Sequence, residues 1–143
     1  MAVQRFTVGE VEHQARLVLL DTHEDAYRFE PDGIYAAMKD GLIRLRQDCP
    51  SSRYVAGLMV DLTFDVRNSE TGVVTASFDD IPNQEYAAQN NFQVKNLVVN
   101  MERTWMTALV YYIVHRMYMR DDADTANAAL ADRYLQLFKE AQR

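Results

Sequence analysis

The sequence is poor in the residues that build fibres, disulfide frameworks and membrane spans. Its 143 residues include five glycines, three prolines and one cysteine, Cys49. So little glycine and proline excludes a collagen-like repeat. A single cysteine can form neither an internal disulfide nor a multi-cysteine zinc site. The most apolar run, residues 105–114, has ten residues, whereas a transmembrane helix needs about 20, so we expect no membrane span.

Basic residues are also in the minority. Fifteen lysines and arginines face 21 aspartates and glutamates, which gives a net charge of −6. This balance disfavours general adhesion to nucleic acid or to anionic lipid. Residues 1–7 contain no apolar stretch of signal-peptide length, so we expect an intracellular origin. The 48% apolar and 25% charged residues are typical of one folded domain, which we expect to span residues 1–143.

Helical signals dominate the first third of the chain. Thr7 and Glu10 have the spacing of a capping box, which predicts a helix from residue 8 to about Asp21. A second helix is predicted to begin at Pro31 because proline suits the first helical position. It should end before Cys49-Pro50, since proline disfavours a helical residue ahead of it.

The middle of the chain has the alternation of β-strands. Apolar and polar residues alternate over residues 60–66, turn residues follow at 68–72, and residues 73–78 are a candidate return strand. This pattern predicts a β-hairpin. Residues 79–91 are polar and are predicted to form a long loop.

A third helix is predicted to begin between residues 92 and 101 and to run to residue 119. From 105 to 119 its apolar residues occupy every side, and such a helix is normally buried all round. Because a chain of this length has few elements to cover it, we expect other subunits to bury part of it.

A fourth helix should follow the acidic cap at residues 121–125. Its predicted inner face consists of Ala131, Tyr134, Leu135 and Phe138. The fold class is therefore mainly α. We predict a four-helix domain, helical at 7–48 and 94–142, with a β-hairpin and loop insertion at about 54–92 between the second and third helices.

No motif indicates metal-dependent chemistry. His13, His23 and His115 lack the spacing of zinc ligands. Acidic clusters occur at 21–25, 79–80 and 121–124, but a calcium loop counted from Asp122 fails, with Asn127 and Arg133 in place of glycine and glutamate. Helix capping explains the last cluster better. We expect no metal and no cofactor.

Nucleophilic catalysis has no signal either. No positioned partner can be identified for Cys49, and the sequence has no nucleophile elbow, phosphate-binding loop or dinucleotide fingerprint. We therefore predict that the protein is not an enzyme. Arg44, Arg46 and Arg53 lie near Tyr54, but a nucleic-acid surface has a stronger basic excess, so solvated ends of the second helix are the favoured interpretation.

Aromatic residues of the last two helices are the candidate interface, because tyrosine, tryptophan and methionine are enriched at protein interfaces. The predicted interface residues are Trp105, Tyr111, Tyr118, Tyr134 and Phe138.

Two blocks of the sequence resemble head-to-tail adaptor (connector, or head-completion) proteins of tailed bacteriophages. The first block contains Thr7-Val8-Gly9-Glu10, Arg16, Leu19-Leu20-Asp21-Thr22, Tyr27-Arg28-Phe29, Asp40-Gly41 and Leu45-Arg46. The second contains residues 108–118, Asp121-Asp122, Asn127-Ala128-Ala129, Tyr134 and Phe138. Together they cover somewhat over half of the chain. The segment between them, about 50–100, is shorter than the β-rich insertion of many related adaptors.

The resemblance implies a helical domain with a β-containing insertion that assembles as a homo-oligomeric ring, typically of twelve copies in this family. The ring would sit beneath the portal protein in the virion neck, after synthesis in the host cytoplasm, and would present a docking surface to a tail or nozzle protein. Residues 122–143 would contact the portal, and the five predicted interface aromatics would meet either the portal or a neighbouring copy. DNA would pass through the channel without specific binding, and no catalysis or membrane contact is implied.

Two other classes of function stay open. The chain could be a small helical protein-binding or regulatory module that uses its tyrosine and methionine surface. It could also be an enzyme that holds a divalent metal in its acidic clusters, an alternative that the failed calcium-loop match disfavours.

Overall fold

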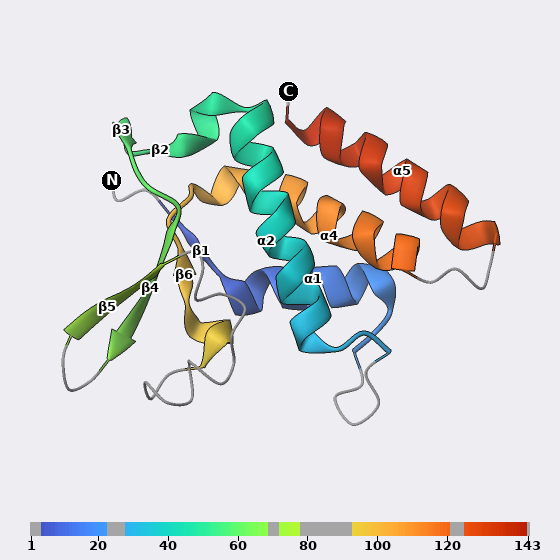
Figure 1. Cartoon of the computed structure of the whole chain (residues 1–143), viewed down its shortest axis with the longest axis horizontal. Helices are drawn as coiled ribbons and strands as arrows, with labels where there is room; N and C mark the ends of the chain where they lie inside the picture. The colour runs from blue at the N-terminus through green and yellow to red at the C-terminus, as the bar shows by residue number, and fades with distance from the viewer. Residues whose placement is uncertain (1–3, 23–27, 69–71, 78–92, 121–124, 143) are drawn as a thin grey trace.

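The computed structural model describes residues 4–22, 28–68, 72–77, 93–120 and 125–142. Within these residues the fold is mainly helical, with a small antiparallel sheet, as predicted (Figure 1). In chain order the elements are β1 (Phe6–Thr7), α1 (Val8–Leu19), α2 (Pro31–Asp48), β2 (Tyr54–Val55), β3 (Leu58–Met59), β4 (Thr63–Asn68), β5 (Gly72–Ser77), β6 (Val98–Val99), α4 (Met106–Arg120) and α5 (Thr125–Ala141).

The first two helices begin and end close to the residues predicted from local sequence signals. The Thr7 side chain accepts a hydrogen bond from the Glu10 N–H at 3.1 Å, which caps the start of α1. Helix α1 ends at Leu19, and the residue that caps it, Leu20, has a left-handed backbone at φ 56°. Pro31 is the first residue of α2, and the helix stops at Asp48, directly before Cys49-Pro50.

The predicted start of the third helix is wrong, because residues 94–105 are not α-helical. Val94–Asn96 and Arg103–Trp105 are short 3₁₀ turns, with strand β6 between them, and helix α4 starts only at Met106. Val98 and Val99 pair with both β1 and β4. Such long-range pairing overrides a helical period, particularly where the residues are β-branched.

Most of helix α4 is covered by its own chain, so its apolar residues do not require burial by other subunits, which was the explanation expected from the sequence. It packs against α1, α2 and α5 (Figure 1). Its buried residues are Ala108, Leu109, Val110, Tyr112, Ile113, Val114, His115 and Met117. A central helix with three helical neighbours explains apolar residues on nearly every side.

The sheet has the strand order β1-β6-β4-β5, and every pair is antiparallel. It contains the predicted hairpin as β4 and β5, but β1 and β6 come from outside the predicted insertion. Val99 stands opposite both Phe6 and Phe64, and all three side chains are buried. This apolar row attaches the sheet to the helical core. The predicted loop at 79–91 lies outside the described residues.

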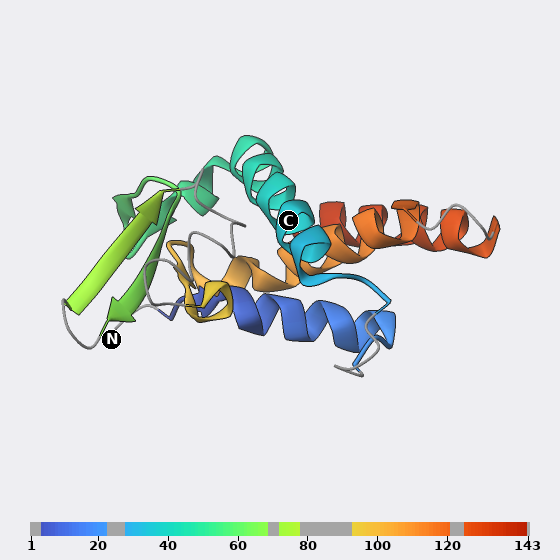
Figure 2. The ribbon, with the colours of Figure 1, turned by 60° about the horizontal axis from the view of Figure 1, so that its bottom comes forward.

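Helix α5 lies along α4 and has the predicted inner face. Ala131 and Phe138 are buried, while Tyr134 and Leu135 are partly buried against the core. The predicted cap at 121–124 lies outside the described residues. Figure 2 shows the sheet at one end of the molecule and the helices extending toward the other. No helix in the described part of the chain has the length and hydropathy of a membrane span.

Candidate interaction surfaces

The five predicted interface aromatics occupy different environments. Tyr111, Tyr118 and Tyr134 are half-buried between α4 and α5, and Trp105 is half-buried just before α4. Phe138 has no exposed surface and packs edge-on against Tyr112, with ring centroids 5.1 Å apart. Phe138 is therefore a core residue in the single chain, so its predicted contribution to an interface stays a prediction.

The structure brings three of the predicted residues together. The Tyr134 ring stacks on Tyr118 at 5.9 Å and lies 6.0 Å from Tyr111. Burial, and secondarily the neighbouring Tyr134, raises the pKa of Tyr118 above its ordinary value. This tyrosine cluster joins α4 to α5 and leaves part of each ring accessible, a combination suited to a contact with another protein.

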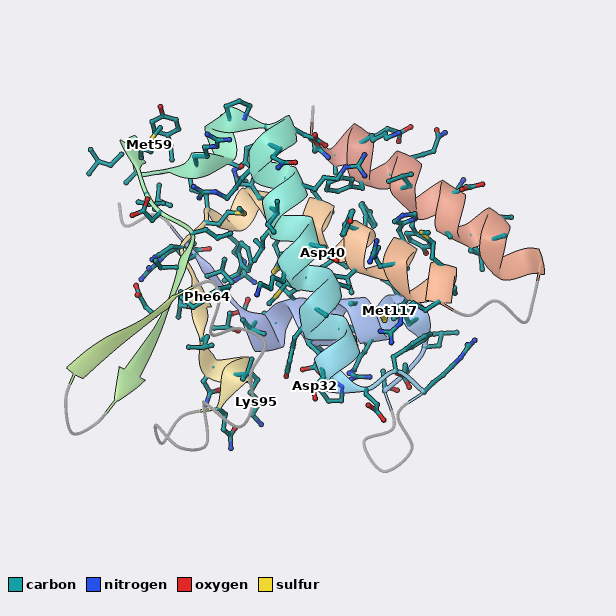
Figure 3. The ribbon with its side chains drawn as sticks, viewed as in Figure 1. Asp32, Asp40, Met59, Phe64, Lys95 and Met117 are labelled. Carbon is teal, nitrogen blue, oxygen red and sulfur yellow. The ribbon has the colours of Figure 1, made fainter. Side chains whose placement is uncertain are left out.

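An apolar hairpin that the sequence analysis missed stands clear of the core. Strands β2 and β3 pair with Tyr54 opposite Met59 and Val55 opposite Leu58. Leu58 is 71% exposed and Met59 65% exposed. The available signal was Ala56-Gly57 between two pairs of apolar residues, a spacing typical of a two-residue hairpin. Figure 3 shows Met59 at the edge of the molecule, away from the helices.

The predicted basic cluster serves the structure of the chain. Arg46 donates to the Val60 carbonyl at 3.2 Å, and Arg53 donates to the Arg46 carbonyl at 3.1 Å. Burial, with a contribution from Arg53, lowers the pKa of Arg46. Arg44 pairs with Asp48 at 3.6 Å. Two of the three arginines thus fix the backbone after α2, whereas the prediction placed the whole cluster in solvent.

A depression of about 440 Å³ lies between the start of α2 and the end of α4. It is lined by Arg28, Phe29, Glu30, Gly33, Met117 and Arg120. Gly33 gives the Arg120 guanidinium room against α2, since a Cβ there would lie 2.6 Å from Nη1. Guanidinium groups at an open depression can bind carboxylate or phosphate, and Glu30 partly offsets their charge.

Among the described residues considered for metal binding and catalysis, Cys49 and His115 have ordinary structural contacts. Cys49 Sγ donates to Gln142 Oε1 at 3.3 Å, and burial raises the pKa of this thiol, which disfavours the reactive thiolate. His115 Nδ1 lies 2.7 Å from the Ala131 carbonyl oxygen, and His13 is exposed. His23 lies outside the described residues. Within the described ranges no three His, Cys, Asp or Glu side chains gather as a metal site.

Comparison of the chain with protein-family models, with curated proteins and with solved structures finds no match.

Proposed function

We propose that this chain is a structural protein of a bacteriophage neck, a head-to-tail adaptor that assembles as a ring between portal and tail. The observation that carries the proposal is that the two resembling blocks fold against each other, through residues that belong to the resemblance itself. The resemblance thus covers one physical unit of the molecule.

Contacts inside the first block hold the connection between α1 and α2. The buried Arg16 side chain donates to Asp21 at 2.8 Å and to the Phe29 carbonyl at 2.9 Å. Asp21 also accepts from the backbone N–H groups of Arg28 and Phe29. All four residues lie in the block that resembles the adaptors, and their network ties the end of α1 to the residues just before α2.

Contacts between the blocks hold α2 against α4. Gly41 permits the close approach, because a Cβ there would lie 2.8 Å from Tyr112 and 2.9 Å from Leu109. Asp40 accepts from Arg116 at 3.3 Å across the same two helices. Residues of the two resembling blocks therefore determine how closely α2 packs on α4. Proteins that share a fold share such close packing between their helices.

The charge of the chain agrees with a conduit for DNA. With a net charge of −6, a ring of many copies would repel the phosphate backbone, and the duplex would slide through without being held. A DNA-binding protein would need the opposite balance.

A small protein-binding or regulatory module remains the second candidate. The exposed apolar hairpin of β2 and β3 favours it, because an exposed apolar patch commonly marks a contact with another protein. The two candidates differ in assembly, since only the adaptor must form a ring that is coaxial with a portal.

Imaging the protein with the portal protein of the same genome by negative stain tests the adaptor role. We expect an added ring on one face of the portal. Charge reversal on the outer face of α5, by Arg133→Glu with Glu140→Arg, should weaken this binding, because residues 122–143 are the proposed portal contact. The exposed Gln14→Ala on α1 serves as the matched control. A small complex without a ring would contradict the proposal and favour the binding module.

A further inference from the structure

A groove runs between α2 and α4, the two helices on which Figure 3 labels Asp40 and Met117. The depression of about 440 Å³ at the start of α2 adjoins a second depression of about 270 Å³. The residues that line both of them are Gly33, Met117 and Arg120. The second depression is also lined by Ala36, Ala37, Asp40 and Arg116. Because they share three residues, the two depressions form one groove, which we call the α2–α4 groove.

Gly33 makes room in this groove for the Arg120 guanidinium. A Cβ at Gly33 would lie 2.6 Å from Arg120 Nη1, and the three atoms nearest to that Cβ all belong to the same guanidinium. Gly33 lies inside α2 without a positive φ, so its backbone does not require glycine. Glycine is also a poor helix former. A residue that weakens α2 and that neither its backbone nor the core requires therefore serves the position of Arg120, and such local conflicts are typical of functional sites.

The Arg120 end of the groove is basic, although the whole chain has a net charge of −6. Two guanidinium groups, of Arg28 and Arg120, line this end together with one carboxylate, of Glu30. The Arg28 guanidinium lies over the Phe29 ring, 5.1 Å from its centroid, a contact that helps to orient it. Within the described parts of the chain, Arg120 takes part in no hydrogen bond or ion pair. Its planar set of donors can therefore accept an anionic oxygen pair.

The charges of the groove favour a ligand with a single negative group. Two guanidiniums and one carboxylate leave a surplus of one positive charge at the Arg120 end. A carboxylate balances this surplus, whereas a phosphate, nearly doubly charged at neutral pH, exceeds it. At the other end of the groove Asp40 and Arg116 pair at 3.3 Å and add no net charge. Two adjoining depressions of this size also exceed what one small anion fills, so they suit a peptide.

We propose that the α2–α4 groove binds a segment of a partner protein in which one acidic side chain precedes small uncharged residues. Arg120, with Arg28, holds the carboxylate, and the rest of the segment lies along Ala36 and Ala37. This site goes beyond the adaptor role, because it is complete in one copy of the chain and needs no ring.

NMR titration of the isotope-labelled chain tests the site with defined peptides. The probes are acetyl-Glu-Ala-Ala-Ala-amide, the neutral analogue with glutamine in place of glutamate, and inorganic phosphate, all at one ionic strength because salt screens exposed charges. The glutamate peptide should shift the Arg120 side-chain N–H and the Gly33 amide in a saturable way. The glutamine peptide should bind about tenfold more weakly, since it lacks the charge-assisted hydrogen bonds.

Two variants place the carboxylate at Arg120. Arg120→Gln should weaken binding of the glutamate peptide about tenfold. Gly33→Ala should weaken it as well, because the added Cβ displaces the guanidinium, while its denaturant midpoint shows that the fold is kept. The matched control is Arg44→Gln, which removes an exposed arginine of the same helix and should bind like the wild type.

The proposal is overturned if the glutamate and glutamine peptides bind equally, if Arg120→Gln binds like the wild type, or if the glutamate peptide causes no saturable shift at Arg120. Saturable binding of phosphate without binding of the glutamate peptide also overturns it, because the groove would then hold a free phosphate and no acidic segment.

Discussion

Arg16 is 3% exposed, yet it carries a full charge into the region between α1 and α2. Glu12 and Asp21 each accept from it at 2.8 Å, so two carboxylates balance the buried guanidinium. Replacing all three charged side chains by apolar ones would change the stability little, because the cost of burying charges offsets their attraction. Removing only one of them, however, leaves a buried charge without its counterion. The sequence pattern did not reveal this burial, because only Glu12 is a neighbour of Arg16 on the same helix, whereas Asp21 and the Phe29 carbonyl lie beyond the end of α1.

Arg16→Met should therefore lower the free energy of unfolding by about 3–5 kcal/mol, since Asp21 is left buried without its cation. The exposed pair of Arg44 with Asp48 provides the control. Arg44→Met should cost less than about 1 kcal/mol, because solvent screens that pair. Urea unfolding of both variants measures the difference, and equal costs would refute the structural role given to Arg16.

Tyr35 should make the protein sensitive to high pH. Its hydroxyl donates to Glu12 at 2.8 Å, and burial first, then this hydrogen bond to a carboxylate, raises the pKa of Tyr35 well above the ordinary value. The folded state therefore holds the phenol proton more tightly than the unfolded state does. The protonated Tyr35 hydroxyl therefore contributes its full share to the free energy of unfolding at neutral pH, and this share falls as the pH rises above about 10.

Tyr35→Phe removes the ionisable group, so the stability of this variant should decline less steeply between pH 9 and 11 than that of the wild type. Thermal unfolding across this range measures the two slopes. Parallel curves would show that Tyr35 does not contribute to the alkaline transition.

At the scale of elements, the predictions that held depend on neighbouring residues in the sequence. Thr7 with Glu10, Pro31, and Cys49-Pro50 mark helix ends by local geometry, and the structure has those ends. The start of α4 was missed because β6 is a strand only through its pairing with β1 and β4, from residues about 90 and 35 positions away. Two-residue strands such as β1 have no local period to detect.

The packing of α2 on α4 predicts opposite outcomes for two glycines of one helix. A Cβ at Gly41 would meet Tyr112 and Leu109, which lie in the closely packed core, so Gly41→Ala should destabilise by about 1–2 kcal/mol. A Cβ at Gly33 would meet only the end of the flexible Arg120 side chain. Gly33→Ala should be neutral or stabilising by up to about 1 kcal/mol, because alanine favours the helix.

Denaturant unfolding of the two variants measures both changes in stability. The midpoint should fall for Gly41→Ala and stay or rise for Gly33→Ala, while the dependence of the unfolding free energy on denaturant concentration stays the same. A Gly41→Ala protein as stable as the wild type would mean that α2 and α4 do not approach as closely as described.

At the scale of the molecule, the sequence predicted the class of fold and only part of the candidate surface. The tyrosines of α4 and α5 do lie together at a half-exposed position, whereas Phe138 is core. Helical spacing gives the face on which a residue lies, but it does not say how deeply the neighbouring helix covers it. Most apolar side chains of α4 are buried by its own chain, and the most exposed apolar residues described are Leu20, just after α1, and Leu58 and Met59 of the β2–β3 hairpin.

The central claim concerns assembly, so the mass of the portal-bound particle tests it most directly. Mass photometry of the portal with and without this chain counts the copies added to each portal. If the chain is the proposed adaptor, a closed ring predicts a single, saturating increment of about twelve copies for each portal. An increment of one or two copies, or none at saturating protein, would contradict the account.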